Sequence, residues 1–138
     1  MQKFIIIFCV LFFWWGCDLP RDTKDTFEKA KKESLHVGVV VRTDSLSSIS
    51  VFEKNLMDQF VAANNLKVSY NHSTETQLVK QLEKDKIDII IGGFTEKTLW
   101  KDKAALTAPY DKEHVWLVKK GENRLVFEIE KFFYNQMQ

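Results

Sequence analysis

From residue 35 onward, hydrophobic positions along the chain follow two spacings in turn. Runs of β-branched residues such as LHVGVVV at 35–41 are typical of strands that are covered on both faces. Between these runs, apolar residues recur every three or four positions, as they do on one face of a helix. The predicted elements are a strand at 35–41, a helix at 52–63, a strand at 66–70, a helix at 74–82, strands at 87–91 and 114–118, and a terminal helix at 123–133.

This alternation predicts an α/β fold, a doubly wound and mostly parallel sheet of four strands with flanking helices. Thr74 and Gln77 have the spacing of a capping box at the start of the second helix. The stretch 98–106 allows one further short helix. In a sheet of this kind, ligands bind beyond the carboxyl ends of the strands. The relevant loops are then 42–48, after the first strand, and 92–95, after the third.

Those two loops supply the candidate ligand-binding residues. The first offers the polar side chains of Asp44 and Ser45. The second, with Gly93, Phe94 and Thr95, combines small residues that let a ligand approach the backbone with a hydroxyl group that can bind it. The other interpretation is that a tight turn after the strand requires small residues and nothing more. The sequence favours neither interpretation.

The first 16 residues have the layout of an export signal, with a basic start ahead of an apolar run at 4–15. The run is too short for a typical membrane span of roughly 20 residues. Gly16 and Cys17 resemble the end of a bacterial lipoprotein signal, in which the cysteine receives the lipid, although the two preceding tryptophans depart from that pattern. The alternative is an uncleaved anchor in which Cys17 has no role. Both interpretations place the domain outside the cytoplasmic membrane.

Residues 17–34 are rich in charge and poor in apolar side chains, so we expect a tether between the lipid and a domain at 35–138. Removal of the signal leaves Cys17 as the single cysteine, and 19 of the 20 basic side chains against 19 acidic ones. No internal disulfide can then form. A neutral domain also argues against nucleic-acid binding, which requires a concentrated basic face.

Four stretches of the domain match a known pattern in order and spacing. They are LHVGVV, VFEKNLMDQFVAANNLKVSY, DKIDIIIGGFTEKT and LTAPYDKEHVWLVKKG. Together they resemble the first lobe of the bacterial extracellular solute-binding proteins of family 3, with its first strand, its Gly-Phe-Asp/Glu helix and second strand, its Asp-Ile-Gly-Thr loop and its Ser-x-Pro-Tyr crossover. The resemblance spans 35–120. It implies one lobe of a type 2 periplasmic binding protein, a small-molecule ligand, and a transporter or sensor as partner.

The chain departs from this family at two points. Five positions after the loop threonine, amino-acid binders of the family carry an arginine that grips the ligand carboxylate, and here Trp100 takes that position. Without the guanidinium fork, we do not expect a plain amino acid as ligand. Trp100 either stacks on an apolar, aromatic or cationic ligand or packs within the fold. The sequence also passes from the crossover straight into the terminal helix, so we expect a single lobe, no hinge closure and weak ligand capture.

No catalytic or metal-binding pattern accompanies these features. His36, His72 and His114 lack a spacing suited to a metal, so neither an enzyme nor a cofactor is expected. We expect a lipid-anchored extracytoplasmic module, a weak small-molecule sensor or an accessory subunit of a membrane-protein partner. The alternative is a structural or protein-interaction envelope lipoprotein with a vestigial crevice. Phe127 and Tyr134, one heptad apart on the terminal helix, are then either half-exposed aromatics or a partner-facing patch.

Overall fold

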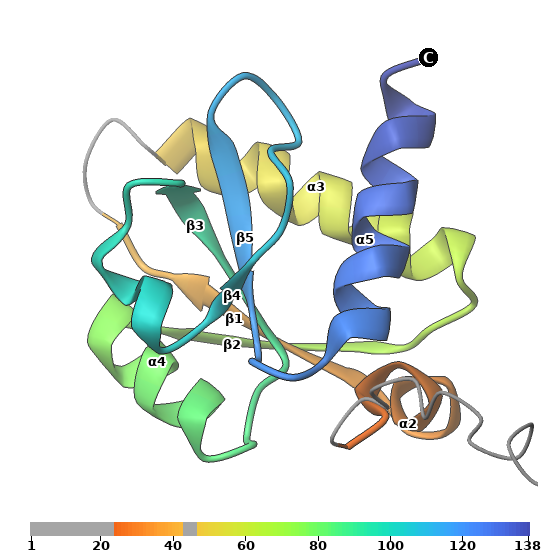
Figure 1. The fold of residues 1–138 in the computed structure, drawn as a ribbon, viewed down its shortest axis with the longest axis horizontal. Coiled ribbons are helices and arrows are strands. Elements are labelled where there is room, and N and C mark those ends of the chain that lie inside the picture. Colours follow the sequence, from red (N-terminus) through yellow and green to blue (C-terminus); the bar gives the residue numbers. More distant parts are fainter. Residues whose placement is uncertain (1–23, 43–46) are drawn as a thin grey trace, which may run out of the picture.

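The computed structural model describes residues 24–42 and 47–138, which are organised around one sheet (Figure 1). The strands are β1 (Leu35–Val40), β2 (Val68–Ser73), β3 (Ile89–Thr95), β4 (Ala105–Leu106) and β5 (His114–Val118). The helices are α2 (Thr26–Lys32), α3 (Ser47–Ala63), α4 (Glu75–Glu83) and α5 (Asn123–Gln136), with a short 3-10 helix, η2 (Leu99–Asp102), before β4. The strands lie in the order β2-β1-β3-β5-β4.

All strands except β5 run in the same direction. β1 pairs in parallel with β2 and β3, and β5 runs antiparallel between β3 and β4. The predicted α/β class and mostly parallel sheet are therefore confirmed. The expected number of four strands is wrong by one, because β4 has two residues, too few to produce an alternating pattern. The helix allowed by the sequence at 98–106 is the single turn of η2.

The sheet is covered on both faces, so the core has two parts. Neighbouring residues of a strand point to opposite sides. In β3, Ile89 and Ile91 pack with α2, α3 and α5, whereas Ile90 packs with α4. All three side chains are fully buried. Double coverage explains why this strand is a continuous hydrophobic run in the sequence.

Helix α2 lies in the segment that we expected to be a tether. Its Phe27 and Ala30 are each 2% exposed and belong to the same buried cluster as α3 and α5. The buried carboxylate of Glu122, beside the start of α5, accepts hydrogen bonds from the backbone N–H groups of Lys24 and Thr26, both at 3.1 Å. This helix is therefore packed onto the domain and is not a tether.

A charged segment becomes part of the core here because its few apolar side chains share one face. Phe27 and Ala30 are three positions apart, which places them side by side on a helix. The guanidinium of Arg124 lies over the Phe27 ring, 5.3 Å from its centroid. Neither feature forms a hydrophobic run that a sequence pattern can detect. The predicted export signal, Cys17 and the first part of the expected tether lie outside the described residues.

Replacing Glu122 with alanine should loosen α2 from the rest of the domain. The substitution leaves the N–H groups of Lys24 and Thr26 without their buried acceptor, which should lower the free energy of unfolding by about 2–3 kcal/mol. Urea unfolding measures this loss, and the α2 amides should exchange hydrogen faster. Glu33→Ala, at the exposed end of the same helix, is the control and should change neither quantity. Unaltered exchange in Glu122→Ala would show that the packing of Phe27 suffices to hold the helix.

Candidate functional site

The carboxyl end of β3 bends at Gly92 and Gly93. The register between β3 and β5 shifts between Ile90 and Phe94, which marks a bulge. A Cβ atom on Gly92 would lie 2.5 Å from Cγ2 of Val40 in β1. Gly93 has a φ of 73°, a left-handed conformation that glycine adopts without strain. Gly92 is thus required by its packing against Val40 and Gly93 by its backbone conformation, whatever else the loop does.

A buried glutamate from α3 fixes this bulge. The side chain of Glu53 is fully buried, and it accepts a hydrogen bond from the Gly93 N–H at 2.9 Å. Its other oxygen accepts from the Tyr110 hydroxyl at 3.0 Å. Burial raises the pKa of Glu53 to about 7, although the hydrogen bonds from Tyr110 and Gly93 act to lower it. One carboxyl group therefore joins α3, the end of β3 and the segment that precedes β5.

A second polar group lies beside Gly92 and consists of Arg42, Glu75 and Trp100; we call it the crevice group. Arg42 follows β1, and its Nε donates to the Gly92 carbonyl oxygen at 2.9 Å. Its Nη2 lies 3.4 Å from Oε2 of Glu75, the first residue of α4. Oε1 of Glu75 accepts from the indole Nε1 of Trp100 in η2. The crevice group thus joins the ends of β1, β3, α4 and η2.

Two of the predicted ligand-binding side chains lie near this end of the sheet. Trp100 is partly buried, and its ring packs against the core cluster between the sheet and α4. Thr95 is partly buried at the end of β3, and its hydroxyl accepts a hydrogen bond from the Lys97 N–H at 3.4 Å. The structure therefore brings Trp100 into the crevice group and leaves Thr95 at its margin.

The remaining predicted residues are placed differently. Phe94 is 4% exposed and packs in the core, so its side chain is not available to a ligand, contrary to our expectation. It lies within β3 and packs in the same cluster as Ile90, four positions earlier, because alternate residues of a strand share a face. The N–H of Gly93 is already bonded to Glu53. Asp44 and Ser45 lie outside the described residues.

Three residues of the site were not among the sequence candidates: Arg42, Glu53 and Glu75. Arg42 is the first residue of the loop after the first strand, which we expected to bind ligand. Its position in the sequence could therefore have identified it as a site residue. Glu53 lies in the segment that resembles the family's Gly-Phe-Asp/Glu helix, but its partners are 40 and 57 positions away in the sequence. Glu75 lies inside the predicted capping box. An acidic residue in the first turn of a helix ordinarily faces solvent and stabilises the helix dipole, so its position in the sequence did not indicate a site.

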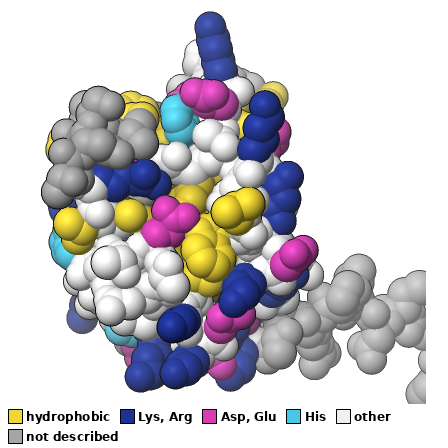
Figure 2. Space-filling model, turned by 90° about the vertical axis from the view of Figure 1, so that its left-hand side faces the viewer, with side chains coloured by type: hydrophobic (Ala, Val, Ile, Leu, Met, Phe, Trp, Pro, Cys, Tyr) yellow, Lys and Arg dark blue, Asp and Glu magenta, His cyan; other side chains and the backbone are white. Residues whose placement is uncertain are grey.

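Figure 2 shows the side of the molecule toward which β1 points. Hydrophobic side chains gather in the middle of this face, with an acidic side chain among them, and basic side chains gather along its lower edge. A cavity of about 370 Å³ is lined by Ile49, Phe52, Tyr110, Asp111 and His114. Ile49, Phe52 and Tyr110 supply apolar surface, so the cavity suits a small apolar group.

His114 has structural contacts at the rim of that cavity. Its Nδ1 lies 2.7 Å from Oδ2 of Asp111, and its ring stacks on the Tyr110 ring with 6.0 Å between centroids. His36 and His72 are exposed. Within residues 24–42 and 47–138, no group of three or more His, Cys, Asp or Glu side chains is placed to hold a metal ion.

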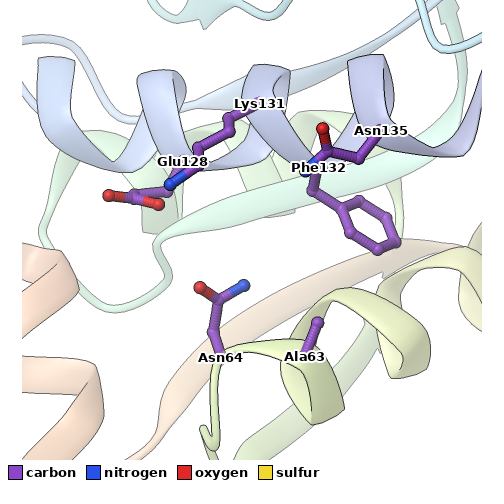
Figure 3. A pocket seen from close by; sticks show the side chains of 6 residues that line it. All are labelled: Ala63, Asn64, Glu128, Lys131, Phe132 and Asn135. Atoms are coloured by element: carbon purple, nitrogen blue, oxygen red, sulfur yellow. The ribbon is translucent and has the colours of Figure 1, made fainter.

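A smaller cavity, of about 180 Å³, lies between the end of α3 and α5 (Figure 3). It is lined by Ala63, Asn64, Glu128, Lys131, Phe132 and Asn135. The Asn64 side chain points from the end of α3 toward α5, and its amide donates to the Phe60 carbonyl oxygen at 2.9 Å. Asn64 thereby satisfies a carbonyl group at the helix end, which explains its place without a ligand.

Replacing Glu53 with glutamine should remove a pH dependence of stability. Because burial raises the pKa of Glu53 from 4.5 to about 7, the folded state holds this proton more tightly than the unfolded chain does. The resulting stabilisation is complete below about pH 4.5 and is lost as the pH rises through about 7, by about 3 kcal/mol in total.

Urea unfolding between about pH 5 and pH 8 should therefore show the wild type losing free energy of unfolding relative to Glu53→Gln. Glu113→Gln removes an exposed carboxylate that lies 3.8 Å from Nε2 of His114, and should keep the wild-type profile. Parallel profiles for the wild type and Glu53→Gln would mean that Glu53 titrates alike in the folded and unfolded states.

The comparisons with known proteins agree with this architecture. Residues 36–136 match the family model of the bacterial extracellular solute-binding proteins, family 3. Among solved structures, a point mutant of domain 1 of TmArgBP in its arginine-bound form superposes with a TM-score of 0.66 at 18% identity, covering 83% of this chain and 97% of that one. The arginine-bound form of domain 1 itself gives 0.62 at 21% identity, covering 73% and 91%.

A mutant of the ArgBP from T. maritima gives a TM-score of 0.52 at 22% identity, with 62% of this chain covering 41% of that one. Identities this low show a shared fold alone. No curated protein sequence matches the chain. The match with single domains over nearly their whole length confirms the single-lobe architecture, and the family match spans most of the chain. The chain belongs to family 3 of the bacterial extracellular solute-binding proteins.

Proposed function

We propose that this chain binds a small molecule at the carboxyl ends of β1 and β3, as an extracytoplasmic module. The observation that carries the proposal is the convergence of Arg42, Glu75 and Trp100 beside the Gly92 carbonyl. Charged, hydrogen-bonding and aromatic groups from separate elements meet there. Open α/β sheets bind their ligands at this end.

A single lobe of this fold is sufficient for ligand binding in another protein, since domain 1 of TmArgBP has an arginine-bound form. This supports binding by the lobe described here. A one-sided crevice covers less of a ligand than two lobes do, which favours weak affinity. Trp100, in place of the family's carboxylate-binding arginine, argues against an amino acid held in the family's usual manner. We infer a weak sensor or an accessory subunit of a transport or sensing system.

Thermal unfolding in the presence of amino acids, polyamines and muropeptides tests the proposal. A ligand at about ten times its Kd should stabilise the folded state by about 1.4 kcal/mol and raise the Tm by several degrees. Trp100→Ala should abolish the shift, and Thr95→Ala should reduce it. Leu99→Ala alters the neighbouring side chain, which is 93% exposed, and should leave the shift intact. No shift at millimolar concentrations of any of these compounds would contradict ligand binding.

A protein-interaction role is the second candidate function. Phe127 and Tyr134 are each 61% exposed on α5, as the helical spacing predicted. Two large aromatic side chains exposed on one helix favour a partner-facing surface. The second function is supported over ligand binding by two results together. The ligand screen gives no shift, and Phe127→Ala and Tyr134→Ala fold normally but lose a specific crosslink to an envelope protein.

We further propose that a lipid on Cys17 holds the domain at the membrane. Membership of an extracellular family supports a place outside the cytoplasm, and a small residue before Cys17 at the end of an apolar run supports lipidation. Cys17→Ser should abolish labelling of the protein with radioactive palmitate and leave the signal uncleaved. Cys9→Ser, inside the signal, is the matched control and should be labelled as the wild type is. A cleaved Cys17→Ser protein would contradict a lipoprotein signal.

A further inference from the structure

The carboxylate of Glu75 is held in the way that a protein holds a bound carboxylate. Each of its oxygens accepts from a different element, Oε1 from the Trp100 indole and Oε2 from the Arg42 guanidinium. One donor is charged and the other is an aromatic N–H, so the pair recognises a negative group with two acceptor atoms. Two converging donors of this kind form a carboxylate-binding site.

Arg42 is fixed in this site independently of Glu75. Its Nε bond to the Gly92 carbonyl oxygen, at 2.9 Å, anchors the guanidinium to the end of β3. Its side chain is 22% exposed and that of Glu75 is 36% exposed, so the carboxylate is the more accessible partner. A partly buried guanidinium that loses its counter-ion is left uncompensated, and it then favours another anion in the same place.

Glu75 can leave without disturbing the fold. It is the first residue of α4, and the Thr74 hydroxyl, not Glu75, accepts the capping hydrogen bond at this helix end. A glutamate side chain gains rotamer freedom when it is released to solvent. Exchange of one carboxylate for another therefore requires a side-chain rotation and no change in the backbone.

The surroundings of the site define the rest of the ligand. The Trp100 ring offers a flat apolar surface, and Nζ of Lys103 lies 5.9 Å from its centroid. Nζ of Lys103 is also paired with Oε1 of Glu83 at 3.7 Å, so with Glu75 turned away the positive charge of the site would come from Arg42. This charge favours an anionic ligand over a cationic one. The indole ring favours a ligand that carries a flat apolar group next to its carboxylate.

We propose that Arg42 and Trp100 form a carboxylate-binding site that Glu75 occupies as an internal competitor, and that the ligand is an aromatic or flat apolar carboxylate which displaces it. This inference rests on the proposed function, since it concerns the same crevice, and it names the ligand class. It differs from the family's usual arrangement, because the arginine comes from the end of β1 and the fifth position after Thr95 supplies an indole. Glu75 sets the affinity by competing for the same donors.

The test is a titration of the full chain with benzoate, followed through the indole N–H resonance of Trp100 in NMR spectra. Glu75→Gln keeps the length of the side chain and removes the competing charge, so the affinity for benzoate should rise about tenfold. Arg42→Met should abolish binding. Arg42→Lys should weaken it, because an ammonium lacks the planar fork. Thermal unfolding without benzoate checks that each variant is folded.

Two controls separate this inference from simpler explanations. Glu96→Gln changes net charge by the same amount on an exposed residue, and should leave benzoate affinity unchanged. Benzylamine has the size of benzoate with the opposite charge, and should not bind. Equal benzoate affinity in the wild type and Glu75→Gln, an equal gain in Glu96→Gln, or binding of benzylamine that depends on Glu75 would each overturn the inference.

Failure of the internal-competitor inference can be distinguished from failure of the proposed small-molecule binding. A ligand from the thermal screen whose shift depends on Trp100 but is the same in Glu75→Gln would leave small-molecule binding standing and overturn the internal competitor. Benzoate binding that rises in Glu75→Gln supports both. Absence of every ligand effect, in the wild type and in Glu75→Gln alike, would overturn both.

Discussion

The buried carboxyl group of Glu53 is the interaction on which this end of the molecule depends. It ties α3 to the bulge of β3 through Gly93 and to Tyr110 ahead of β5. The Tyr110 ring in turn contacts Phe133 of α5, with 5.7 Å between centroids. Burying a carboxyl group is unfavourable unless its hydrogen bonds are satisfied, so its position restricts all of these elements at once. The bulge of β3, whose Gly92 carbonyl also holds Arg42 of the crevice group, is therefore tied to the aromatic core.

The two glutamates near the strand ends have opposite properties because their surroundings differ. Glu53 is fully buried, and its raised pKa reflects the loss of water around it. Glu75 is accessible and faces a guanidinium and an indole. The first residue fixes backbone geometry, and the second is free to exchange with solvent or with another anion. Rigid support beneath an exchangeable contact is the arrangement that a binding site requires.

Helix α2 shows that the folded domain begins before β1. Its burial against α5, and the two hydrogen bonds that Glu122 accepts, extend the folded region to residues ahead of β1. Under the proposed lipid anchor, the chain between Cys17 and Lys24 spans at most roughly 25 Å. The domain would then lie close to the bilayer. In Figure 1, α2 lies away from the carboxyl ends of β1 and β3.

The sequence by itself determined the fold class, and it indicated the end of the sheet at which we propose the site. Buried strands, amphipathic helices and the Thr74 cap, whose hydroxyl accepts from the Gln77 N–H, are local patterns with a fixed period or spacing. Trp100, which the structure places in the crevice group, was among the sequence candidates because it follows a recognisable loop. A two-residue strand such as β4 and a short helix such as α2 carry too few residues for a period to show.

Only the tertiary structure decided which side chains meet at the site. Arg42, Glu75 and Trp100 come from three separate segments, and Glu53 meets partners 40 and 57 positions away. Strand β3 continues through Gly92 and Gly93 and buries Phe94 in the core, although the sequence placed this residue in a ligand loop. Period and spacing act between near neighbours along the chain, whereas these contacts depend on how strands and helices pack, and that is set by the whole core.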